Sequence, residues 1–193
     1  MNKLDQAFWE NKYKNHQTGW DIGYVSTPIK EYVDQLENKD LKILIPGAGN
    51  AYEAEYVWQK GFKNVFVLDI ARQPLSNLKS RINFPEDQVL NLDFFEFDDR
   101  FDLILEQTFF CALNPSLRID YSKKMFNLLN DDGKLVGLLF DFELTEKGPP
   151  FGGDKQEYLG YFSDYFKIKT LARAYNSIKP RRDRELFFIF EKK

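Results

Sequence analysis

Short apolar runs alternate with amphipathic segments through the middle of the chain. The runs at residues 41–46 and 64–69 predict buried strands, and the stretches 52–60 and 74–81 predict helices after each of them. Gly61 is placed to end the first helix. Strands that alternate with helices are typical of a mostly parallel sheet covered on both faces.

The pattern continues toward the carboxyl end. Residues 88–92 and 101–106 predict two further strands, and a helix is expected over residues 117–129. Gly133 is a natural turn residue before a longer apolar run at 134–142, which predicts the fifth strand. The central part of the chain therefore predicts five mostly parallel strands.

The first 36 residues predict two helices that precede the sheet. Residues 3–13 have the spacing of a short amphipathic helix. Pro28 is placed to open a second helix that runs to Leu36, and Thr27 is its expected N-cap.

The last 30 residues predict a different kind of pairing. The runs 166–174 and 185–191 are rich in apolar residues, and no helix fits between them, so they are expected to pair as an antiparallel hairpin. The prediction is then an α/β fold with a mostly parallel seven-stranded sheet, a C-terminal antiparallel hairpin and helices on both faces. This layout resembles the Rossmann-like fold of class I methyltransferases, an analogy that does not settle function.

The composition is that of one ordinary globular domain. Of the 193 residues, 43% are hydrophobic and 17% aromatic, enough to fill a core. The 27 basic and 30 acidic residues give a net charge of -3, which argues against a nucleic-acid surface. The single cysteine, Cys111, excludes an internal disulfide and fits a reducing compartment.

Nothing in the sequence indicates a membrane segment or a metal site. No apolar run approaches the ~18 residues of a membrane span, and the polar residues 1–6 lack the core of a signal peptide. The only histidine, His16, lies in a polar stretch and is assigned no role. We therefore expect a cytoplasmic protein, a monomer or weak homodimer, that acts on a small molecule and on neither nucleic acid nor membrane.

The strand at 41–46 ends in a glycine turn, and the next strand ends in an acid. Gly47 and Gly49 let the backbone approach a ligand, and Asp69 follows Gly49 by ~20 residues, the spacing of an acid that binds ribose hydroxyls. Tyr52 occupies the position of the third small residue in a dinucleotide fingerprint, which favours S-adenosylmethionine over NAD. The alternative is a helix-start turn in an unrelated α/β fold.

A second cofactor contact is expected after the strand at 88–92. Asp93 is an acid suited to the adenine amino group, and Phe94 beside it is suited to cover the ring. The alternative gives both residues local roles, with Asp93 capping a turn and Phe94 in the core.

The most specific segment begins where the strand at 101–106 ends, at the edge where α/β sheets bind ligands. It reads E-Q-T-F-F-C-A-L-N-P-S-L-R over residues 106–118. Further motifs are F-W-E-N-K-Y at 8–13, G-W-D at 19–21, I-P-G-A-G at 45–49, L-D-I at 68–70, D-F-F at 93–95, G-P-P-F at 148–151 and P-R-R-D-R-E at 180–185. Taken in sequence order, these motifs resemble those of the thiopurine methyltransferase superfamily. They most resemble its branch of thiol and halide methyltransferases.

Four positions depart from the pattern of that superfamily. Tyr13 stands where members often have Trp, Ala48 where they often have Cys, and Glu106 where they usually have Asp. Phe151 replaces the Tyr of the G-P-P-Y form and so removes a phenolic hydroxyl near the expected acceptor pocket. These departures spare the cofactor features more than the acceptor features.

The resemblance implies a single methyltransferase domain over residues 1–193 whose first 36 residues form a helical lid. Aromatic faces in such a lid suit a sulfonium through cation–π attraction; the alternative is that these rings only dock a terminal helix. The implied cofactor contacts are Trp9, Tyr13, Trp20, Gly47, Gly49, Asp69, Asp93, Phe94 and Glu106.

The resemblance also implies candidates for the acceptor pocket. For Arg118 the alternative is a surface arginine at a helix start, and for Arg181 it is a solvated turn. Cys111 has no partner base in the sequence that would make it a nucleophile. The acceptor-pocket candidates are Phe109, Phe110, Arg118, Phe151 and Arg181.

The implied reaction moves a methyl group from S-adenosylmethionine to a small soft nucleophile, namely a thiol, bisulfide or halide. A thiol with a pKa near ~8.5 is partly ionised at neutral pH and a halide needs no base, so a dedicated base is not required. The alternatives are a heteroaromatic thiol or metalloid oxyanion as acceptor, a non-catalytic cofactor-binding module, and a nucleotide-dependent oxidoreductase, which Tyr52 disfavours.

Overall fold

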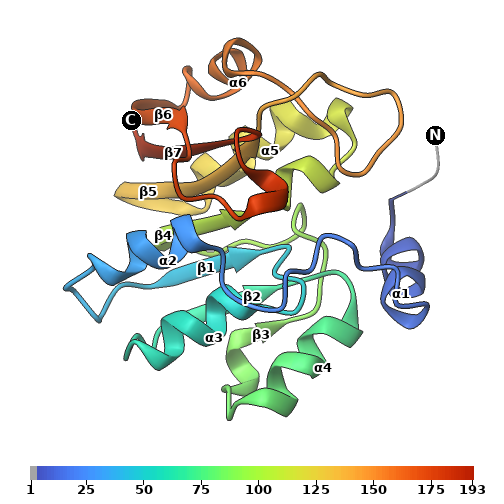
Figure 1. Ribbon diagram of the computed structural model, residues 1–193. Coiled ribbons are helices and arrows are strands. Elements are labelled where there is room, and N and C mark those ends of the chain that lie inside the picture. Colours follow the sequence, from blue (N-terminus) through green and yellow to red (C-terminus); the bar gives the residue numbers. More distant parts are fainter. Residues whose placement is uncertain (1–3) are drawn as a thin grey trace.

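A computed structural model describes residues 4–193 and has one seven-stranded sheet at its centre (Figure 1). The strands lie in the order β3-β2-β1-β4-β5-β7-β6. Their bounds are β1 Ile43–Pro46, β2 Val65–Leu68, β3 Val89–Leu90, β4 Phe101–Gln107, β5 Leu129–Phe140, β6 Phe166–Arg173 and β7 Glu185–Lys192. The predicted Rossmann-like sheet is confirmed.

The strand pairing places the ligand-binding edge of the sheet. Strands β3, β2, β1, β4 and β5 are parallel, whereas β7 is antiparallel to both β5 and β6. Ile43 of β1 pairs with Val65 on one side and with Leu103 on the other. The strands before β4 are added toward one edge of the sheet, and β4 and β5 are added toward the other edge. This makes the boundary between β1 and β4 a topological switch point, and such points bind ligands at the carboxyl ends of their strands.

Helices cover both faces of the sheet, as predicted. One face packs against α2, α3 and α4 around Leu103 and Leu105 of β4. The other face packs against α5 and α6 around Ile104. The helix bounds are α1 Gln6–Lys14, α2 Thr27–Asp34, α3 Tyr52–Gln59, α4 Arg72–Arg81, α5 Arg118–Asn127 and α6 Lys155–Phe162.

Phenylalanine rings fill the core under the C-terminal hairpin. Phe162 of α6 lies 5.0 Å from Phe190, whose ring centroid is 4.4 Å from that of Phe188. Phe166 at the start of β6 packs on Phe162 and Phe190. Burying one such side chain contributes about 1.5–3 kcal/mol, so this cluster explains how the antiparallel end of the sheet is held.

Several local predictions differ from the structure. The N-cap of α2 is Ser26 rather than Thr27, because Thr27 already has helical geometry. Strand β5 begins at Leu129, so Gly133 lies within the strand rather than in a turn before it. Helix α1 begins at Gln6 behind its N-cap Asp5; the predicted helix began at residue 3, outside the described residues.

Helix α6 was not predicted. Its apolar residues, Tyr158, Leu159, Tyr161 and Phe162, have helical spacing but span less than two turns, and Gly160 among them is a poor helix former. Its start is marked by Asp154, whose carboxylate accepts a hydrogen bond from the Glu157 N–H at 2.8 Å. Among residues 4–193, the structure contains no helix with the length and apolar character needed to cross a membrane.

Candidate functional site

The turn after β1 has three residues with left-handed backbone conformation. The φ angles of Gly47, Gly49 and Ala51 are +57°, +54° and +56°. A Cβ on Gly47 would lie 2.2 Å from Cδ2 of Phe109, and one on Gly49 would lie 3.0 Å from the Tyr13 hydroxyl oxygen. Glycine is therefore needed at position 47 for the backbone angle and for the close approach of an aromatic ring.

Asp69 lies at the end of β2, and its carboxylate binds the glycine turn. It accepts hydrogen bonds from the backbone N–H groups of Gly49 and Ala71, both at 2.8 Å. Burial raises the pKa of the Asp69 carboxyl to about 6, because the loss of water outweighs these two bonds. A carboxylate has about four acceptor positions, so two stay open for the ribose hydroxyls expected there.

Aromatic residues of α1 and of the loop that follows it cover the glycine turn. Trp20 contacts Trp9 and Tyr13 edge to face, with ring centroids 5.5 and 5.8 Å apart. Burial and the nearby Asp69 raise the pKa of the Tyr13 hydroxyl, so it stays protonated. All three rings line the cavity described below, and they also dock α1 on the body; the two interpretations from the sequence are both compatible with this placement.

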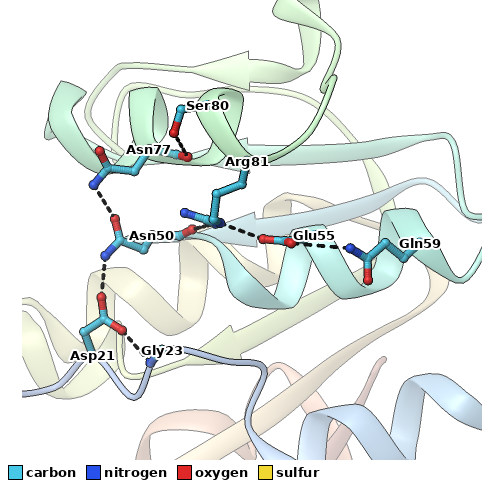
Figure 2. A network of polar contacts seen from close by, with 8 residues as sticks. All are labelled: Asp21, Gly23, Asn50, Glu55, Gln59, Asn77, Ser80 and Arg81. Carbon is cyan, nitrogen blue, oxygen red and sulfur yellow. Dashed lines mark hydrogen bonds and ion pairs between the residues drawn. The ribbon is translucent and has the colours of Figure 1, made fainter.

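A polar network ties the segment after Trp20 to the glycine turn (Figure 2). Asp21 accepts a hydrogen bond from the Asn50 side chain, and Asn50 in turn accepts one from Asn77 of α4 at 2.8 Å. Arg81 donates to the Asn50 carbonyl and pairs with Glu55 of α3 at 2.7 Å. Asn50 thus links the N-terminal segment to α4, and Arg81 extends the network from α4 to α3.

Asp93 and Phe94 have local structural contacts and also line the cavity. Asp93 accepts a hydrogen bond from the Phe95 N–H at 2.8 Å and so caps a turn. Phe94 is 4% exposed, and its ring centroid lies 5.1 Å from that of Phe109. Both residues also line the cavity, so local structure and ligand contact are not exclusive here.

Glu106 points away from the cavity, into the layer between β4 and α5. Its buried carboxylate accepts hydrogen bonds from the N–H groups of Phe109 and Phe110 and from the Tyr121 hydroxyl. Burial raises the pKa of this carboxyl to about 7. The structure therefore places Glu106 where it holds the loop after β4, and does not bring it to the lining with the other expected cofactor contacts.

Three expected acceptor contacts, Phe110, Arg118 and Phe151, also lie behind the cavity wall. Arg118 is fully buried 4.7 Å from the centroid of the Phe110 ring, so the alternative of a surface arginine is wrong. It pairs with Glu157 at 2.8 Å and donates to the carbonyl of Gly152 at 2.7 Å. These contacts hold α5, α6 and the loop at 141–153 together, so Arg118 carries structure rather than a ligand.

Arg181 reaches the cavity from the connection between β6 and β7. Its guanidinium donates to the Trp20 carbonyl at 2.7 Å and lies 3.5 Å from the Glu185 carboxylate. Its side chain is 11% exposed, so the alternative of a solvated turn is wrong. Cys111 lines the same cavity, and burial raises the pKa of its thiol, which keeps it from acting as a thiolate.

The cavity at the carboxyl ends of β1, β2 and β4 has a volume of about 840 Å³, within the usual range for small-molecule sites. An open carboxylate, aromatic faces and this volume together fit an adenosine-type cofactor with a sulfonium. The predicted residues that line it are Trp9, Tyr13, Trp20, Gly47, Gly49, Asp69, Asp93, Phe94, Phe109 and Arg181.

Sequence reasoning missed several lining residues. Asp21, the acid of the G-W-D motif, and Asn50, which directly follows the glycine turn, both line the cavity. Gln107 and Glu53 also line the cavity. A signal was present for Gln107, because a polar residue directly after a buried strand stands at the ligand edge of a parallel sheet.

Comparison with known families and proteins places the chain. The family model of thiopurine S-methyltransferase matches residues 4–192. Probable thiol methyltransferase 2 of Arabidopsis thaliana is 28% identical over 82% of this chain and 72% of its own length. Thiocyanate methyltransferase 1 of the same plant is 27% identical over 94% and 83%, and a thiopurine S-methyltransferase of Vibrio parahaemolyticus is 24% identical over 83% of each chain.

Solved structures agree with this placement at the level of the fold. A 1,6-didemethyltoxoflavin-N1-methyltransferase of Burkholderia thailandensis with bound S-adenosylhomocysteine superposes with a TM-score of 0.76 at 17% identity, over 97% of this chain and 87% of that one. A TehB-like methyltransferase of Corynebacterium glutamicum gives a TM-score of 0.68 at 18% identity, over 97% and 98%. The family match, the sheet order and the cavity together assign this chain to the thiopurine S-methyltransferase family of S-adenosylmethionine-dependent methyltransferases.

Proposed function

We propose that this enzyme transfers the methyl group of S-adenosylmethionine to a small, soft, anionic nucleophile, which is a thiolate, bisulfide or halide. The observation that carries the proposal is the guanidinium of Arg181 in the cavity wall: besides its 3.5 Å ion pair with Glu185 and its bond to the Trp20 carbonyl, it has further N–H donors for an anionic acceptor. The printed names of two relatives, a thiol and a thiocyanate methyltransferase, support an acceptor of this class.

The cofactor site of the proposal uses residues that follow the carboxyl ends of four strands, β1, β2, β3 and β4. Asp69 would accept hydrogen bonds from the ribose hydroxyls, and Phe94 would lie on the adenine. Gly47 and Phe109 would border the sulfonium, with Trp20 above them in the lid formed by residues up to 36. S-adenosylmethionine supplies an already activated methyl group, so these residues bind, orient and exclude water.

The ionisable groups of the cavity support an acceptor that needs no base. Asp69 is engaged by two backbone N–H groups, and the buried carboxylate of Glu53 accepts one from Ser26 at 3.0 Å. The thiol of Cys111 stays protonated at neutral pH. The proposal assigns Asp69 to the ribose, and Glu53 and Cys111 are buried, so it uses none of the three as a base, whereas thiols are ionised in part and halides carry no proton.

The test is a methyl-transfer screen of the purified full chain with labelled S-adenosylmethionine. Iodide, bisulfide, thiocyanate and thiophenol represent the proposed class, and a thiopurine and tellurite represent the alternative acceptors. We expect volatile or extractable methylated product with the first group and a kcat/KM at least tenfold lower with the second. Turnover with the thiopurine or tellurite alone would refute the proposal. We further propose a single domain that works in the cytoplasm as a monomer or weak homodimer; sedimentation would test the oligomeric state.

A further inference from the structure

Gln107 is the one cavity-lining residue whose buried side-chain polar atoms have no hydrogen-bond partner within residues 4–193. Both Nε2 and Oε1 of its carboxamide are buried and unpaired. A buried amide without hydrogen-bond partners lowers stability, so its presence calls for a partner that the protein itself does not supply, such as a bound ligand.

The position of Gln107 lies between the two halves of the cavity. It is the last residue of β4 and pairs with Leu138 of β5, whose strand ends at Phe140 in the cavity wall. On the other side β4 pairs with β1, where Leu44 is opposite Ile104, and the glycine turn that follows β1 lines the same cavity. The carboxamide thus stands between the cofactor turn and the wall that carries Phe140.

Strand alternation explains why this amide faces the cavity while its neighbour does not. Glu106 points into the layer with α5, where its carboxylate is fully used by the loop after β4. Gln107 has the opposite orientation, shared with Leu103 and Leu105, on the side of α2 and α3. On that side the cavity wall also carries Glu53 and Arg181.

We propose that the carboxamide of Gln107 binds the methyl-accepting atom, an inference that rests on the proposed function. Its Nε2 group donates a hydrogen bond to the anionic sulfur or halide, and its Oε1 accepts one from the S–H group when a thiol arrives protonated. A neutral donor orients an anion without neutralising its charge, which leaves the lone pair reactive. This makes Gln107 a residue that selects soft anions and thiols.

The transfer step balances with no further reactant. A lone pair of the acceptor forms the new bond to the methyl carbon as the bond from that carbon to the sulfonium sulfur breaks. The electron pair of the broken bond stays on that sulfur, which becomes a neutral thioether. A thiol acceptor loses its proton to solvent before attack, so Gln107 holds the nucleophile and exchanges no proton.

The test compares wild-type enzyme with Gln107→Leu, a change that keeps size and removes both polar atoms. With iodide and with thiophenol we expect kcat/KM to fall at least tenfold, while the Kd of S-adenosylmethionine from calorimetry stays within twofold. The urea midpoint of the variant without ligand is expected to rise, because the buried unpaired amide is gone. Gln107→Asn, which keeps the amide at shorter reach, is expected to recover part of the loss.

Gln88→Leu is the matched control, because Gln88 also has a buried unpaired Oε1 but donates to the Lys63 carbonyl away from the cavity. We expect its kcat/KM to equal that of wild type. An unchanged kcat/KM in Gln107→Leu, an equal loss in the control, a lowered urea midpoint in Gln107→Leu, or a loss that falls on cofactor affinity each overturns the inference. Failure of the proposed function is distinguished by wild-type enzyme that turns over none of the small acceptors, which overturns both.

Discussion

Replacement of Gly47 by alanine tests how the cofactor turn and the loop after β4 fit together. The new Cβ would lie 2.2 Å from Cδ2 and 2.4 Å from Cγ of Phe109, whereas ordinary contacts begin at 3.4 Å, so the ring has to retreat by more than an ångström. The left-handed φ of +57° adds the cost of a side chain in that region. The expected loss of stability therefore has two causes, a steric clash and a backbone cost, and a control variant can separate them.

The expected magnitude follows from these two causes. A left-handed alanine costs about 1–2 kcal/mol, and overpacking of a rigid aromatic contact costs about 1–3 kcal/mol, so the free energy of unfolding should fall by about 2–5 kcal/mol. Gly61→Ala is the control, because Gly61 has a φ of +92° and nothing within 4 Å of its Cβ position. That variant should lose only the backbone contribution, about 1–2 kcal/mol.

The assay is urea unfolding followed by circular dichroism, with calorimetry of S-adenosylmethionine binding on the same samples. Gly47→Ala should bind the cofactor more weakly, because its displaced Phe109 ring enters the cavity, whereas Gly61→Ala should bind as wild type does. In a double-mutant cycle, Gly47→Ala and Phe109→Ala should show a coupling free energy of about 1–3 kcal/mol, because the new Cβ no longer clashes once the ring is removed. Equal unfolding free energies for Gly47→Ala and Gly61→Ala, with an additive double variant, would refute the packing argument.

Three further changes test other parts of the site. Asp69→Ala should weaken S-adenosylmethionine binding by roughly 1–3 kcal/mol in calorimetry, since it removes a charge-assisted acceptor; unchanged affinity would take Asp69 out of the site. Arg118→Ala should lower the free energy of unfolding in urea by about 3–5 kcal/mol, because Glu157 and the Gly152 carbonyl lose their buried partner. The folded variant should keep the KM of the acceptor. The pKa of Glu106 is raised from 4.5 to about 7, so folding takes up a proton between these values and stability falls as pH rises from 4.5 to 7; Glu106→Gln should remove that slope from unfolding free energies measured across this range.

The fold was accessible from the sequence because its signals are local. Apolar runs of four to eight residues with helical segments between them predict parallel strands, and the lack of an α-helical pattern between residues 174 and 185, where the structure has only a 3₁₀ turn at Lys179–Arg181, predicts the hairpin. Helix α6 escaped because its apolar residues, from Tyr158 to Phe162, pack against a phenylalanine cluster assembled from distant strands. The helix has only eight residues and includes Gly160, so its periodic signal is too short to stand out without these tertiary contacts.

The cofactor half of the site was more predictable than the acceptor half for a physical reason. Gly47 and Asp69 have backbone roles fixed by a turn and a strand end, and such roles leave a spacing in the sequence. Arg118 and Arg181 have the same side chain, yet one is fully buried in an ion pair with Glu157 and the other lines the cavity. Whether each arginine is buried or lines the cavity depends on which loops pack over it, and residue spacing in the sequence does not determine this packing.

The segment after β4 shows why a motif must be divided by strand geometry before roles are given to its residues. Glu106 and Gln107 are adjacent, but the pleat of β4 sends the acid toward α5 and the amide toward the cavity. The acid then fixes the backbone of Phe109 and Phe110, and the Phe109 ring in turn closes on Gly47. A change at Glu106 therefore acts on methyl transfer through the position of a ring, whereas a change at Gln107 acts on the acceptor, so the two variants should differ in whether cofactor affinity moves together with kcat/KM.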